Sequence, residues 1–141
     1  MKRIIVGSFC LILVGFLVLS WAMFGDRPSY QTGLARHERL PNTASDITIY
    51  QNKNMSGVFI ADFNIAEHDF VSFAAEQHWF LQPISGSVSV FHATAFHEGR
   101  PNDKKEIIDG LYYSKRAANG GGVMVVYDRK NGRGYIDSSS R

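Results

Sequence analysis

The longest pattern in the chain is an uninterrupted run of uncharged, mostly apolar residues, Ile4–Phe24. A helix rises about 1.5 Å per residue, so a helix of this length spans about 30 Å, the thickness of a bilayer's hydrocarbon core. Trp21 and Phe24 lie near the far end, where aromatic rings favour the membrane interface. The run therefore predicts that residues 1–24 form an uncleaved signal-anchor, a single-pass transmembrane helix.

Other interpretations of this run remain open. Ser20 and Ala22 have the small side chains and the spacing of a signal-peptide cleavage site, so cleavage near Ala22 would release a secreted protein. The run is longer than the usual signal-peptide core of about 7 to 15 residues, which favours the anchor. Lipidation of Cys10 is disfavoured because bulky Phe9 precedes it. Cys10 is the only cysteine, which excludes intramolecular disulfides and cysteine-rich zinc sites.

The charges that flank the run predict its orientation. Lys2 and Arg3 favour a cytoplasmic N-terminus and an extracytoplasmic domain, which is periplasmic in a cell with two membranes. Arg27, Arg36 and Arg39 count in the opposite direction, but the short basic N-terminus favours N-in. Residues 25–39 are polar and contain proline and glycine, as a juxtamembrane linker does, and residues 40–141 are expected to form one small domain.

Apolar alternation and helical spacing define the first half of this domain. Residues 47–50 and 58–65 alternate as strands do, and the second strand places Phe59, Ala61, Phe63 and Ile65 on one face. Residues 66–78 change to helical spacing, with Asn64 as the expected N-cap. This helix is predicted to pack on the apolar face of the sheet.

The second half of the domain is predicted to consist mainly of further strands. Strands are predicted at 87–96, 111–115, 123–128 and 134–137, with one helical turn near 104–108 and a hairpin through Asn131-Gly132. The order is two strands, one helix and four strands joined by short turns. This order predicts an α+β domain with a small, mainly antiparallel sheet and one helix packed on one face.

The sheet face away from the helix is not clearly polar. Val58 and Ile60 point there, together with Val88 and Val90 or Met124 and Val126. If the face is uncovered, it is an apolar patch of the kind that marks an interaction surface. The alternative is that the sheet curls, or that residues 25–45 and 97–110 cover this face.

Two histidines, His92 and His97, are the weak candidates for a metal site. A separation of five residues puts them on opposite faces of a strand and about 140° apart on a helix. Neither arrangement gives a recognised zinc spacing, so the sequence predicts no metal and no cofactor. His92 is expected inside the domain, and His97 in the loop that follows.

Basic residues in the predicted turns are weak candidates for binding an anionic lipid or an acidic partner. The candidates are Lys115, Arg116, Arg129 and Arg133, with Tyr113 nearby, and the alternative is that these are ordinary solvated turn residues. The chain has 15 Lys and Arg and 13 Asp and Glu, and its excess comes from Lys2 and Arg3. A domain of balanced charge gives no reason to expect a nucleic-acid partner.

The sequence thus favours a membrane-anchored, non-catalytic protein. Its small extracytoplasmic domain is expected to bind a protein partner or a second copy of itself. The alternative is a small envelope hydrolase whose site is assembled from distant histidine, serine and aspartate residues, since no nucleophile motif occurs along the chain.

Overall fold

The computed structural model describes residue 14 and residues 27–53 and 57–140. The predicted anchor, Ile4–Phe24, lies outside this part of the chain except for Val14. Within the part that the structure describes, no helix has the length and apolar character needed to cross a membrane.

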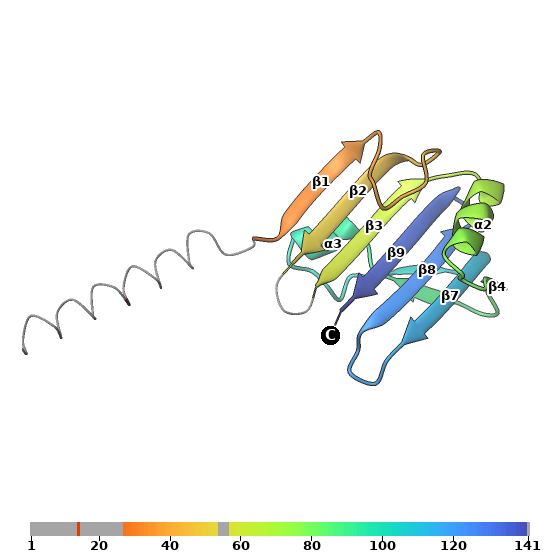
Figure 1. The fold of residues 1–141 in the computed structure, drawn as a ribbon. Helices are drawn as coiled ribbons and strands as arrows, with labels where there is room; N and C mark the ends of the chain where they lie inside the picture. Colours follow the sequence, from red (N-terminus) through yellow and green to blue (C-terminus); the bar gives the residue numbers. More distant parts are fainter. Residues whose placement is uncertain (1–13, 15–26, 54–56, 141) are drawn as a thin grey trace, which may run out of the picture.

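A seven-stranded sheet forms the centre of the domain (Figure 1). Its strand order is β1-β2-β3-β9-β8-β7-β4, and every pair of neighbours is antiparallel. The strands are β1 (Ser29–Leu34), β2 (Ser45–Asn52), β3 (Val58–Asn64), β4 (Gln82–Pro83), β7 (Gly110–Arg116), β8 (Gly122–Asp128) and β9 (Arg133–Ser139). The predicted α+β class, with a mostly antiparallel sheet and one main helix, is confirmed.

Pairing between β3 and β9 joins the two halves of the sheet. Val58 pairs with Ser139 and Asn64 with Arg133, and the pairing has no register shift between them. Each strand also belongs to a meander of its own, β1-β2-β3 or β7-β8-β9. The turn between β8 and β9 contains Asn131 and Gly132, as predicted, and Gly132 has a φ of 61°.

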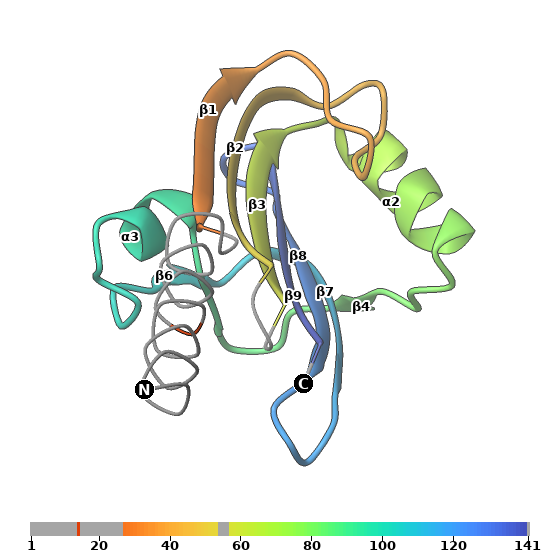
Figure 2. The same cartoon turned by 60° about the vertical axis from the view of Figure 1, so that its left-hand side comes forward.

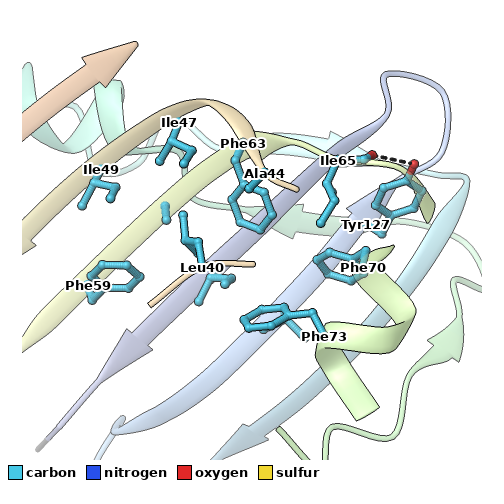
Figure 3. Close-up of a cluster of buried hydrophobic side chains, with 13 residues drawn as sticks. Leu40, Ala44, Ile47, Ile49, Phe59, Phe63, Ile65, Phe70, Phe73 and Tyr127 are labelled. Atoms are coloured by element: carbon cyan, nitrogen blue, oxygen red, sulfur yellow. Dashed lines mark hydrogen bonds between the residues drawn. The ribbon is translucent and has the colours of Figure 1, made fainter. Parts of the chain in front are cut away.

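Helix α2 (Glu67–Glu76) packs on one face of the sheet. Its buried side chains Phe70 and Phe73 join the inward residues of β2, β3 and β8 in the main core, which Figure 3 shows. The predicted face of 58–65 is confirmed, because Phe59, Ala61, Phe63 and Ile65 all belong to this core: Leu40, Ala44, Ile47, Ile49, Phe59, Ala61, Phe63, Ile65, Phe70, Phe73, Val125, Tyr127 and Ile136.

A second layer covers the opposite face of the sheet (Figure 2). It consists of β5 (Val88–Val90), α3 (Ala93–His97) and β6 (Lys105–Ile107), with β5 and β6 paired to each other. Val90 and Ile107 pack against Val126 and Tyr135 of the large sheet in a second buried cluster. Ile60 is fully buried. The face suspected of being an exposed apolar patch is therefore covered, in part by the 97–110 segment, as the alternative expected. Val88 and Val90, expected on this face of the sheet, belong instead to the covering layer, and residues 29–34 join the sheet itself.

Four local predictions differ from the structure. Residues 29–34, expected as linker, form the edge strand β1, whose mostly exposed polar side chains lack the alternation of a buried strand. Residues 93–97 form α3 rather than continuing a strand, and residues 105–107 form β6 rather than a helical turn. The N-cap of α2 is Ala66 without a side-chain cap, because Asn64 bonds to Arg133 and Asp46 instead.

Gly134 of β9 leaves the space that two aromatic rings fill. A methyl group at this position would lie 2.8 Å from Phe63 Cε2 and 2.9 Å from Phe70 Cε2. The Gly134→Ala variant should therefore lose about 1–3 kcal/mol of unfolding free energy through overpacking, measured by urea titration. Ser138→Ala, on the same strand and the same face, should change stability by less than about 0.5 kcal/mol. Equal stability of Gly134→Ala and the parent would contradict this packing.

Candidate functional site

The end of α2 fixes the position of an aromatic segment. His78 takes a left-handed conformation with a φ of 59°. The N–H of His78 donates to Ala75 O at 3.0 Å, and the N–H of Trp79 donates to Ala74 O at 2.8 Å. These two bonds form a Schellman motif, which commonly places the residue after the turn against the last turns of the helix. The Trp79 ring accordingly packs edge-on against Phe73, with centroids 5.5 Å apart.

Beyond this turn the chain exposes a group of apolar side chains, which we call the Phe80 patch. Phe80 is 79% exposed and Val71, on the outer side of α2, is 42% exposed. These two residues, with Ala75, His78, Trp79 and Leu81, line one hollow of about 340 Å³. Phenylalanine is among the residue types most often buried, and aromatic residues are enriched at protein interfaces.

A larger depression, the α2 groove, lies on the other side of Trp79. It has a volume of about 840 Å³ and runs between residues 38–43 and the flank of α2. Phe59, Val123 and Ile136 of the sheet contribute to its lining, as do Phe73 and Trp79. Trp79 is therefore shared by the groove and the Phe80 patch, and the two form one continuous candidate site.

Charge in the α2 groove is mainly negative. Glu38, Asp69 and Glu76 contribute carboxylates to the lining, and Arg39 is the cation among the lining residues. The Arg39 guanidinium lies 4.2 Å from the centre of the Phe59 ring, so part of its charge is directed at an aromatic face. An occupant with apolar and cationic groups matches this surface best.

The basic candidates from the sequence do not come together. Lys115 and Arg116 end β7, whereas Arg129 and Arg133 flank the β8–β9 turn at the opposite end of the sheet. The strand length that separates these two ends is about 20 Å. Tyr113 lies on the α2 face, half-buried against the main core. The structure therefore divides these candidates between two regions.

Carboxylates also pair with the candidate arginines. Arg116 binds Asp137, and Arg129 binds Glu67 and Asp109 with N–O distances of 2.7 and 2.8 Å. The hydrogen bond from Arg129 lowers the pKa of the Glu67 carboxyl.

Arg133 joins three elements. Its guanidinium donates to Asp62 at 2.6 Å, and to Asp46 and Asn64 at 2.8 Å. Asp62 also accepts the backbone N–H of Ala93, which links α3 to β3. In the described structure Arg133 therefore serves as an internal cross-link.

His92 and His97 lie at the two ends of α3. His92 is the half-buried N-cap residue, and His97 is exposed in the last turn. The His97 ring stacks on Tyr30 of β1 at 4.0 Å, with an interplanar angle of 2°. Within residues 27–53 and 57–140, no group of three or more histidine, cysteine or acidic side chains has the geometry to hold a metal.

The described serines give no support to a hydrolase site. Ser72 donates to His68 O at 2.9 Å, and Ser89 donates to Glu106 at 3.3 Å. Among the hydrogen bonds of the described residues, none joins a serine hydroxyl to a histidine ring. A nucleophile–base pair of the kind that activates serine is therefore not seen in this part of the chain.

Sequence reasoning missed the Phe80 patch, although a signal was present. Trp79-Phe80-Leu81 are consecutive apolar residues that follow the polar turn Gln77-His78 at the end of the helix. Comparisons of the chain with protein-family models, with curated proteins and with solved structures found no match. The residues just described are therefore the basis for a functional proposal.

Two buried aspartates on the second face test the electrostatics of the domain. Burial raises the pKa of Asp137, which lies between Ile60 and Met124, despite the attraction of Arg116. Burial also opposes ionisation of Asp128, but hydrogen bonds from Asn131 and Lys105 outweigh it and lower the Asp128 pKa. The pKa values of the two carboxyl groups are thus shifted in opposite directions.

The pH dependence of two variants should differ in sign. As pH rises through the ordinary aspartate pKa of about 3.9, ionisation of Asp137 favours the unfolded state, so wild type should lose stability relative to Asp137→Asn. Ionisation of Asp128 favours the folded state, so Asp128→Asn should become less stable relative to wild type over the same range. Urea titrations of the three proteins at acidic and neutral pH measure this, and trends of the same sign would contradict it.

Proposed function

We propose that the chain is a single-pass membrane protein whose non-catalytic, extracytoplasmic domain binds a protein partner through the Phe80 patch. The observation that carries this proposal is the exposure of Phe80 beside Val71, Trp79 and Leu81. A protruding aromatic residue next to a half-buried one is the arrangement in which a few side chains supply most of an interface's binding energy.

The α2 groove adds a chemical requirement for the partner. Because the carboxylates of Glu38, Asp69 and Glu76 line an otherwise partly apolar groove, a partner segment with a basic side chain beside an apolar one is favoured. Trp79 lines both the α2 groove and the Phe80 patch, so it would contact a partner segment that occupies either of them. The membrane anchor in this proposal is the run Ile4–Phe24, with its N-terminus in the cytoplasm.

Cross-linking from position 80 tests the proposal. A photo-reactive amino acid in place of Phe80, in the full chain in native membranes, should give a discrete cross-linked product. Ile108 is the matched control, because it is 71% exposed and belongs to neither the Phe80 patch nor the α2 groove. Products of equal yield from both positions, or from neither, would contradict the proposal, and a product of twice the chain's mass would identify a second copy as the partner.

A substitution measures the energetic part of the proposal. Phe80→Ser should weaken binding of the cross-linked partner at least about tenfold, because an exposed aromatic anchor is removed. It should leave the unfolding free energy unchanged within about 0.5 kcal/mol, since the side chain makes few contacts in the domain. Ile108→Ser should change neither quantity. Unchanged affinity of Phe80→Ser would assign binding to another surface.

A further inference from the structure

The strand ends and turns at one end of the sheet carry an excess of cationic side chains. Register places Asn52, Val58, Ser139, Gly122 and Arg116 in one row across this end. Ser29, where β1 begins, pairs with Gln51 in the adjacent row. We call it the basic end, and it comprises residues 27–30, 51–53, 57–58, 115–122 and 137–140. Figure 1 shows the start of β1, the β7–β8 turn and the end of β9 at this end of the sheet.

The charges of the basic end are unbalanced. Its cations are Arg27, Lys53, Lys115 and Arg116. Asp137 is the one carboxylate among its described residues, and it pairs with Arg116. Within the described part of the chain, Lys53 and Lys115 form no ion pair.

Carboxylates are concentrated elsewhere. At the opposite end of the strands, Asp46, Glu67, Asp109 and Asp128 all pair with cations of that end or of the second layer. Glu98 and Asp103 follow His97, which stacks on Tyr30 of the basic end, and both carboxylates pair with Arg100. Arg129 and Arg133 at the opposite end are therefore neutralised by carboxylates, whereas Lys53 and Lys115 of the basic end form no ion pair among the described residues.

A hollow at the basic end has the same sign of charge. It has a volume of about 390 Å³, and its lining includes Arg39, Lys53 and the hydroxyl-bearing residues Ser138, Ser139 and Ser140. No carboxylate is among the described residues that line it. Cationic and hydroxyl groups together suit a phosphate oxygen, which accepts charge-assisted hydrogen bonds.

The position of β1 in the chain connects this end to the membrane. β1 begins at Ser29, and the predicted anchor ends at Phe24. Even a fully extended connection of this length reaches at most about 18 Å. The start of β1 cannot move far from the bilayer surface if the anchor is inserted, so the basic end is the part of the domain held nearest to the lipid headgroups.

We propose that the basic end docks on the headgroups of anionic phospholipids, with the hollow beside Lys53 receiving a headgroup phosphate. This inference rests on the proposed membrane anchor and adds a lipid preference and an orientation.

Energy transfer from two labelled positions tests this orientation. The full chain with Cys10→Ser carries one dye, at Ser140→Cys of the basic end or at Asn42→Cys in the loop at the opposite end. Each protein is reconstituted into vesicles of phosphatidylcholine, or of phosphatidylcholine and phosphatidylglycerol two to one, with an acceptor on the headgroups. Transfer from position 140 should exceed that from position 42. It should rise when phosphatidylglycerol is present, and added salt should abolish that rise.

Charge reversal identifies the groups involved. Lys53→Glu combined with Lys115→Glu should remove the rise with phosphatidylglycerol, whereas the control Lys130→Glu, an exposed lysine in the β8–β9 turn, should keep it. Thermal unfolding of each variant confirms that the fold is retained. A chain that stays in vesicles after alkaline washing but shows no lipid dependence, or has position 42 closer to the bilayer, overturns this inference and leaves the anchor intact. A chain that the wash releases overturns the proposed function and this inference together.

Discussion

The pairing of β3 with β9 is the constraint on which the rest of the structure depends. It joins segments more than sixty residues apart in the chain, Val58–Asn64 and Arg133–Ser139, along their whole length. On one face of this pair Phe63 lies against Gly134, and the space left by the missing side chain of Gly134 also accommodates Phe70 of α2. The other face brings Asp62 and Arg133 together, and Asp62 in turn receives the backbone of α3. Both layers of the domain are thus positioned by one central ladder.

The surfaces of the domain around this pair of strands differ in chemical character. Arginines in the strand ends and turns are largely occupied by carboxylates, as the contacts of Arg116, Arg129 and Arg133 show. Lys53 and Lys115 of the basic end form no ion pair among the described residues. The exposed aromatic residue Phe80 lies beside α2. In the proposed account these are two different contacts, one with lipid and one with protein, on one small fold.

Local patterns in the sequence predicted the elements that bury a full face. Residues 58–64, α2 and the β8–β9 hairpin were found because their apolar spacing or turn chemistry is strong. Edge strand β1 was missed because an edge strand with mostly exposed side chains needs no alternation. Residues 93–97 have apolar and β-branched side chains that suit a strand, and their helical form accompanies a long-range bond to Asp62 that no local pattern reveals. The Phe80 patch depends on the turn at His78, whose left-handed backbone is uncommon for a residue other than glycine and is not indicated by the local apolar pattern.

The most direct measurement of the account is the position of the domain relative to the membrane. The full chain with Cys10→Ser and Ser140→Cys is expressed in cells, and an impermeant maleimide is added while the cytoplasmic membrane is intact. The account predicts that Ser140→Cys is labelled from outside and that the chain stays in the membrane fraction after alkaline extraction. Labelling only after the cytoplasmic membrane is permeabilised, or release of the chain by alkali, would contradict it.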